Sequence, residues 1–280
     1  MLGNMVRYLV LFGVLCGALA DDSGIDPDKE YAWGENVGWV SGAPTNAGIT
    51  VHFNGQVGWL SGNAWGENVG WIVMGSASNG PYVNTTSTNW GLNMDATGKL
   101  SGYAWGENIG WVNFGHEQCG AAIDPEYGRF TGYAWGENIG WLHLGGLSTN
   151  YGVRTLAFDT QVKGTPNWWL NHHHVGEDYD EGDGVSAWKE YIADTDPNDS
   201  SSFLHITSLS SSTGKRLVTF SPVSTQRCYT LRRRAGLKAG GWTAVPGQVS
   251  VQYETGGEKT MQDNNAATAA FYTVRAGVTP

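Results

Sequence analysis

Basic residues are scarce in this chain, which carries 16 Lys and Arg against 26 Asp and Glu. Arg7 is the one charged residue among the first twenty, so a chain that loses this segment has a net charge of −11 instead of −10. A surface this acidic repels the phosphate backbone of nucleic acids. We therefore expect no nucleic-acid partner, and cations such as Ca2+ are better suited as ligands.

Cysteine is rare, and long apolar runs are missing after residue 20. Beyond Cys16 the chain has only Cys119 and Cys228, and their positions do not say whether they pair. No later segment is apolar enough over a sufficient length to predict a membrane span. The chain also lacks a nucleophile elbow, a phosphate loop, a dinucleotide fingerprint, a haem site and zinc-ligand spacing, which favours a non-enzymatic protein.

Residues 1–20 have the pattern of a signal peptide. Arg7 precedes a short apolar run from Tyr8 to Leu15, and Ala18-Leu19-Ala20 is a small-x-small cleavage site. This pattern predicts a secreted protein, extracellular or at the cell surface. A lipid anchor on Cys16 is the less favoured alternative, because the preceding Leu15 is bulky for a lipoprotein cleavage site.

Four copies of the octapeptide AWGEN(V/I)GW dominate the chain, at residues 32–39, 64–71, 104–111 and 134–141. Their first Trp residues are 32, 40 and 30 positions apart. Alternating, β-branched stretches bounded by glycine flank the copies and indicate short strands. After an N-terminal linker at 21–30, we therefore expect an all-β tandem array of short-strand Trp/Gly repeats over residues 31–163, either solenoid-like or a closed ring.

The paired Trp residues have two interpretations. The favoured one makes them the core and inter-unit packing residues of repeats too small to bury enough surface alone, and the other makes them exposed platforms for sugar rings. The centre of each copy is either extended or a tight turn that Asn108 and its equivalents tolerate. The Trp residues concerned are Trp33, Trp39, Trp65, Trp71, Trp105, Trp111, Trp135 and Trp141.

The repeated glutamate favours structure over catalysis. A hydrolytic site is one asymmetric pair of carboxylates, whereas this residue recurs in the same local frame in every copy. We expect it to cap turn amides or to pair with Asn. The residues are Glu35, Glu67, Glu107 and Glu137.

The array begins and ends on complementary halves. It opens with an octapeptide that no strand precedes, and it closes with a strand at 151–159 that no octapeptide follows. These halves either meet within one molecule as a ring or pair head-to-tail between molecules as a fibre. The unequal spacings favour the fibre, because a closed ring should tolerate them poorly.

Residues 164–202 form an Asp-rich segment that predicts a Ca2+ site. Aligned with an EF-hand loop, Glu181, Asp183 and Glu190 fall at positions three, five and twelve, and Val185 offers its carbonyl at position seven. Tyr179 stands at position one, where Asp178 or Asp180 could substitute. Residues 203–280 then read as short strands separated by turns, typical of a small antiparallel β-sandwich.

Two resemblances cover most of the chain. The segment 168–199, with Gly182-Asp183-Gly184 and Asp194-Thr195-Asp196-Pro197, resembles the thrombospondin type 3-like calcium segments of exported bacterial proteins, which often precede a β-sandwich; Asp194 replaces their usual glycine. The octapeptides resemble the GYAWxENIGW repeats of exported bacterial proteins. The first resemblance implies Ca2+ binding and the second implies no activity.

The sequence as a whole favours a non-catalytic extracellular structural protein. We expect a self-assembling subunit of a surface filament or layer, with calcium stabilising its linker. The alternative is a carbohydrate-binding adhesin that uses the paired Trp residues on a surface polysaccharide.

Overall fold

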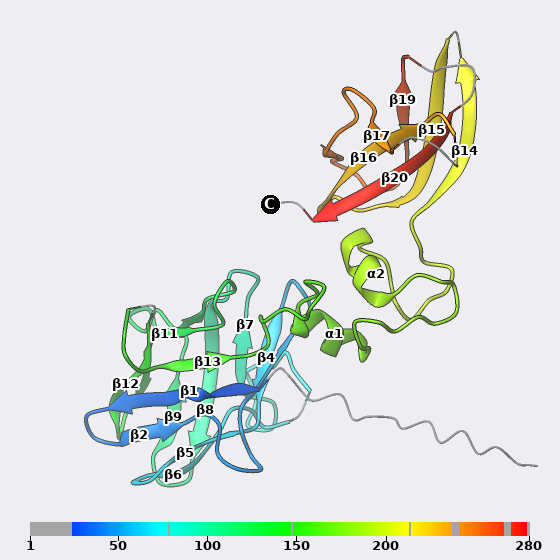
Figure 1. The fold of residues 1–280 in the computed structure, drawn as a ribbon. Coiled ribbons are helices and arrows are strands. Elements are labelled where there is room, and N and C mark those ends of the chain that lie inside the picture. Colours follow the sequence, from blue (N-terminus) through cyan, green and yellow to red (C-terminus); the bar gives the residue numbers. More distant parts are fainter. Residues whose placement is uncertain are drawn as a thin grey trace, which may run out of the picture.

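The computed structural model describes residues 24–77, 79–146, 148–212, 214–236, 241–265 and 270–278. The signal peptide expected at residues 1–20 lies outside them. The described chain is all-β apart from two short helices, which lie between the repeat domain and a C-terminal sandwich (Figure 1). Within these ranges, no helix has the length and apolar character needed to cross a membrane.

The four octapeptides form four hairpins that close into one antiparallel ring. Each hairpin pairs with the next, and β12 of hairpin four pairs with β1 of hairpin one. The array is therefore a ring and not an open solenoid. Its strands are β1 (Ile25–Gly34), β2 (Gly38–Ser41), β5 (Asn63–Gly66), β6 (Gly70–Val73), β8 (Leu100–Gly106), β9 (Gly110–Asn113), β11 (Phe130–Gly136) and β12 (Gly140–Gly145).

Each octapeptide reverses through a tight turn. In hairpin three the Ile109 amide donates to the Gly106 carbonyl at 3.2 Å, and Gly110 follows with φ of 75°. A Cβ on Gly106 would lie 2.7 Å from Cγ1 of Ile109, so only glycine fits at this position. The turn alternative is thus correct, but the left-handed residue is Gly110 rather than Asn108.

A second tier of short strands completes each unit of the ring. β13 pairs with the first half of β1, where Ile25 lies opposite Thr155. Arg154 Nη1 donates to Asp26 Oδ2 across this pairing, at 2.9 Å. The tier consists of β3 (Thr50–Phe53), β4 (Gly58–Ser61), β7 (Leu92–Met94), β10 (Ala122–Ile123) and β13 (Val153–Thr155).

This closure corrects two expectations. The complementary halves of the array pair with each other within one chain. The fibre hypothesis assumed unpaired strand edges at the two ends of the array, and these edges are paired. Residues 25–30, expected in a linker, belong to β1. The unequal spacings are absorbed outside the ring, because residues 79–90 form a loop held by Tyr82, whose hydroxyl donates to the Leu60 carbonyl at 3.0 Å.

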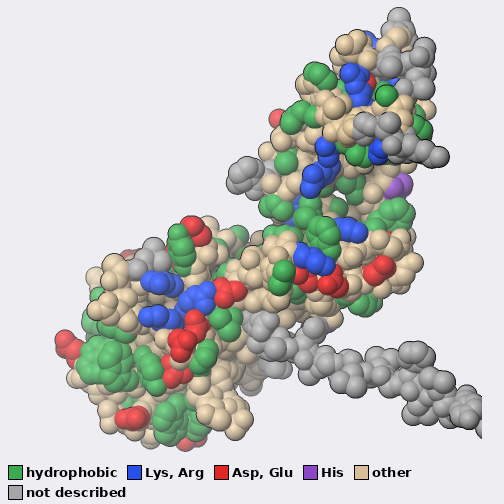
Figure 2. All heavy atoms as spheres, in the orientation of Figure 1, with side chains coloured by type: hydrophobic (Ala, Val, Ile, Leu, Met, Phe, Trp, Pro, Cys, Tyr) green, Lys and Arg blue, Asp and Glu red, His purple; other side chains and the backbone are tan. Residues whose placement is uncertain are grey.

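Small and branched side chains fill the ring, and the Trp residues lie outside it. The inward residues beside the turns are Ala32, Val40, Ala64, Ile72, Ala104, Val112, Ala134 and Leu142, all buried. Alternation along the strands turns the Trp residues outward, and six of them are 37–47% exposed. The expectation that Trp forms the core is therefore wrong. Figure 2 shows hydrophobic side chains gathered on the outer face of the ring, with acidic side chains around them.

The linker contains α1 (Asn167–His173) and α2 (Ala187–Ala193), and the sandwich follows. One sheet has the order β14-β15-β19, and in the other β16 pairs with β17 and β18 on one edge and with β20 on the opposite edge. Cys119 and Cys228 are both free. The sandwich strands are β14 (His205–Ser212), β15 (Lys215–Val223), β16 (Arg227–Arg234), β17 (Thr243–Ala244), β18 (Val251–Gln252), β19 (Gly257–Asp263) and β20 (Phe271–Val278).

Candidate functional sites

The joints between neighbouring hairpins share one register. At each joint the first Trp of one octapeptide lies opposite the residue two positions after the second Trp of the preceding octapeptide. This opposite residue, which we call the floor residue, differs at every joint. The pairs are Trp65 with Ser41, Trp105 with Val73, Trp135 with Asn113 and Trp33 with His143.

The asparagine of each octapeptide holds its joint together. Its Nδ2 donates to a turn carbonyl of the preceding hairpin at 3.1–3.2 Å: Asn68 to Val37, Asn108 to Val69, Asn138 to Ile109 and Asn36 to Ile139. The four octapeptide glutamates are exposed at the turns and make no hydrogen bond or ion pair with the described residues. The expectation that glutamate caps the turn or pairs with Asn is therefore wrong.

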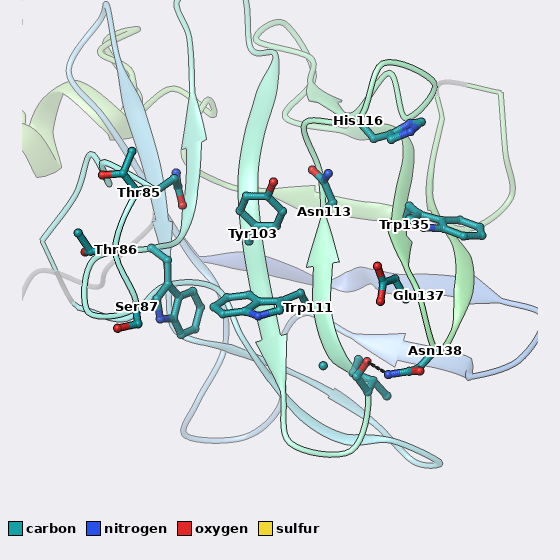
Figure 3. A pocket seen from close by; sticks show the side chains of 14 residues that line it. Thr85, Thr86, Ser87, Tyr103, Trp111, Asn113, His116, Trp135, Glu137 and Asn138 are labelled. Atoms are coloured by element: carbon teal, nitrogen blue, oxygen red, sulfur yellow. Dashed lines mark hydrogen bonds between the residues drawn. The ribbon is translucent and has the colours of Figure 1, made fainter.

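The joint between hairpins three and four opens into a groove of about 760 Å³, which we call groove A (Figure 3). Trp111 and Trp135 line it, and the Glu137 carboxylate lies between their rings in this view. Asn113 is the floor residue. Trp90, from the loop at 79–90, packs edge-on against Trp111 with 5.0 Å between ring centroids and adds an outer wall.

The joint between hairpins four and one forms groove B, of about 620 Å³. Trp141 and Trp33 line it, and His143 is the floor residue. His143 Nδ1 lies 2.5 Å from the Tyr151 hydroxyl, and burial lowers the pKa of this histidine. Each groove therefore combines exposed indole faces with a few polar groups, an arrangement common in small-molecule sites.

The Trp residues also pack against each other within each hairpin, with centroids 4.8–4.9 Å apart. The sequence interpretation expected the Trp residues to pack between repeat units, whereas this packing lies within each hairpin and the rings remain accessible. It missed Trp90, Tyr151 and the floor residues. The floor residues were detectable, because theirs is the position after GW(V/I/L) that varies from copy to copy.

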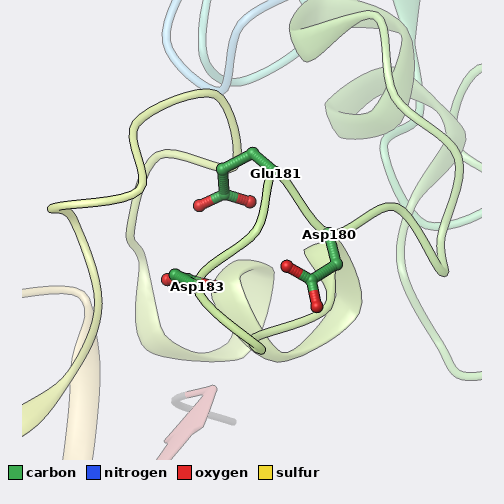
Figure 4. A group of neighbouring side chains, drawn as sticks. All are labelled: Asp180, Glu181 and Asp183. Atoms are coloured by element: carbon green, nitrogen blue, oxygen red, sulfur yellow. The ribbon is translucent and has the colours of Figure 1, made fainter.

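Three acidic side chains of the linker lie close together. Asp180, Glu181 and Asp183 each offer a carboxylate oxygen within 4.8 Å of the other two (Figure 4). The amides of Gly182 and Gly184 donate to Asp180 Oδ1 at 2.8 and 3.1 Å and lower the pKa of Asp180. Asp183 Oδ1 accepts from the Val185 amide at 2.7 Å.

Glu190, on α2, is 0% exposed, and the charges of Glu181 and Asp183 act on its carboxyl group. Its Oε1 is 3.3 Å from Thr195 Oγ1, while Oε2 is buried without a partner, as are both carboxylate oxygens of Glu181. Burial, with the charge of Glu181 next, raises the pKa of Glu190 to about 7. Buried carboxylate oxygens without donors fit a cation. Asp178 instead pairs with Lys163, outside the cluster, which leaves Asp180 for position one of the loop.

Comparison with protein-family models, with curated proteins and with solved structures finds no match.

Proposed function

We propose that this protein is a secreted, non-catalytic carbohydrate-binding protein, and that the grooves of its ring bind neutral polysaccharides. The observation that carries the proposal is the exposure of six of the eight paired Trp side chains. Trp side chains are normally largely buried in a folded protein. Here they lie around the outer surface, beside amide, hydroxyl and carboxylate groups. Indole faces stack on the flat faces of sugar rings, while such polar groups hydrogen-bond the hydroxyls.

The charge of the grooves favours neutral glycans. Glu137 in groove A and Glu35 in groove B are the acidic lining residues, and neither groove has Lys or Arg among the described residues that line it. An anionic polymer would meet repulsion there, which the acidic chain as a whole reinforces. The single carboxylate in each groove favours binding over hydrolysis, because glycoside hydrolysis normally uses a pair.

The surface-filament interpretation has less support. It rested on open strand edges at the two ends of the array, and those ends pair with each other. The adhesin alternative gains instead, because its platforms are exposed.

The test is affinity electrophoresis of the mature protein through gels that contain hydroxyethyl cellulose, glycol chitin or, as an anionic control, alginate. We expect retardation in a neutral gel and none in alginate. Trp111→Ala should remove most of the retardation that groove A contributes. Trp71→Ala is the matched control, because Trp71 has similar exposure and the same 4.8 Å pairing but lines neither groove. Free migration in every gel would contradict the proposal.

A second proposal concerns the linker. We infer that Asp180, Glu181, Asp183 and Glu190 bind Ca2+, supported by the buried carboxylate oxygens that have no donor. The ion would neutralise these carboxylates and stabilise the linker between ring and sandwich. Calorimetric titration with CaCl2 should show binding that Asp183→Asn with Glu190→Gln removes; identical heats in both proteins would contradict it.

A further inference from the structure

Grooves A and B are two versions of one site. The joints that form them have the same register, and equivalent side chains line both. The equivalents, groove A before groove B, are Trp111 and Trp141, Trp135 and Trp33, and Glu137 and Glu35. A site that occurs twice on one chain presents two places for the same class of ligand.

Both grooves also receive an aromatic side chain from outside the octapeptides. Trp90 packs on Trp111 in groove A. In groove B, Tyr151 lies beside His143 and packs edge-on against Trp39, with 5.2 Å between centroids. Trp90 and Tyr151 thus extend the walls of two of the four joints.

The floor residue is where the grooves differ. Asn113 Oδ1 accepts from the Gly115 amide at 2.8 Å, which leaves its Nδ2 to donate to a ligand. His143 uses Nδ1 toward Tyr151, which leaves its other ring nitrogen for a ligand. An amide donor and an imidazole nitrogen select different arrangements of sugar hydroxyls.

We propose that the protein is bivalent: each groove binds one segment of neutral glycan, and Asn113 and His143 give the two sites different preferences. This inference rests on the proposed carbohydrate binding. The grooves flank hairpin four, where the Trp135 and Trp141 rings are paired at 4.9 Å. Two glycan segments would therefore lie on either side of one hairpin, so that one protein can hold two chains of a polymer together.

Isothermal titration calorimetry of the mature protein tests this inference, with β-1,4-linked hexamers of glucose and of N-acetylglucosamine as probes. We expect two sites per chain with unequal affinities. Trp90→Ala should weaken one site about tenfold or more and spare the other. The backbone bonds of Trp90 to Ser76 remain in this variant, so its melting temperature should stay near that of the parent.

The exchange His143→Asn gives a second, independent readout. It gives groove B the same floor residue, asparagine, as groove A. The glycan affinities of the two sites should therefore become more alike. One site per chain, or equal weakening of both sites by Trp90→Ala, would overturn bivalency and leave carbohydrate binding intact. If neither hexamer gives heat and the neutral gels also fail to retard the protein, the proposed function fails and bivalency fails with it.

Discussion

Asn36 donates from Nδ2 to the Ile139 carbonyl at 3.1 Å, although 103 residues separate the two along the chain. The same bond, between neighbouring repeats, recurs at the other three joints. The first and last hairpins are thus joined in the same way as consecutive ones. Because the four joints are equivalent, ring closure can be tested by substituting the asparagine of one joint at a time.

Asn36→Ala should destabilise the ring as much as Asn108→Ala does. Each change leaves one turn carbonyl without its donor, which costs about 1 kcal/mol and lowers the melting temperature by roughly 2–4 °C. In an open array Asn36 would have no acceptor, and its loss would cost nothing. Thermal melts of both variants distinguish the two cases, and an unchanged melting point for Asn36→Ala alone would contradict ring closure.

Closure also predicts the state of association. Because β13 covers the first half of β1, we expect light scattering to show one chain per particle at all protein concentrations. Deleting residues 151–159 uncovers that edge and should promote aggregation. The fibre hypothesis predicts the reverse, a polymer from the full chain and a monomer from the deletion.

The buried Glu190 predicts a pH dependence. Its pKa is about 7 in the fold against 4.5 ordinarily, so between these values the folded state holds more protons than the unfolded state. In chelator, stability should fall as pH rises from 5 to 8, by roughly 3–6 °C in melting temperature. Ca2+ competes with this proton, so it should raise the melting temperature more at pH 8 than at pH 5.

Glu190→Gln is the control for that measurement, because it removes the titrating carboxyl group and keeps the size of the side chain. It should flatten the decline in chelator and remove the calcium response. An equally steep decline in the variant would show that Glu190 is not the titrating group.

The sequence predicted the strands and repeats well, but not their closure. Periodicity and glycine placement carry local information, so β3 and β13 were expected close to where they lie. Closure depends on partners as distant as Asn36 and Ile139, and spacing alone favoured the wrong alternative. The unequal spacing of the repeats misled because residues 79–90 fold outside the ring, where extra length costs little.

The two kinds of candidate site also differ in how far the sequence could predict them. Asp180, Glu181 and Asp183 lie next to one another in sequence, so a local spacing pattern was enough to group them; whether they bind Ca2+ stays a prediction. The grooves instead join residues from separate hairpins and loops. Trp90 had no repeat pattern to mark it, and only the fold brings it to Trp111.

A crystal structure of the mature protein soaked with the β-1,4-linked hexamers would test carbohydrate binding most directly. We expect sugar density stacked on Trp111 and Trp135 in groove A, within hydrogen-bonding distance of Asn113, and a second segment on Trp141 and Trp33 in groove B. Density on the C-terminal sandwich, or none over the indole faces at saturating hexamer, would contradict the proposal that these grooves bind glycans.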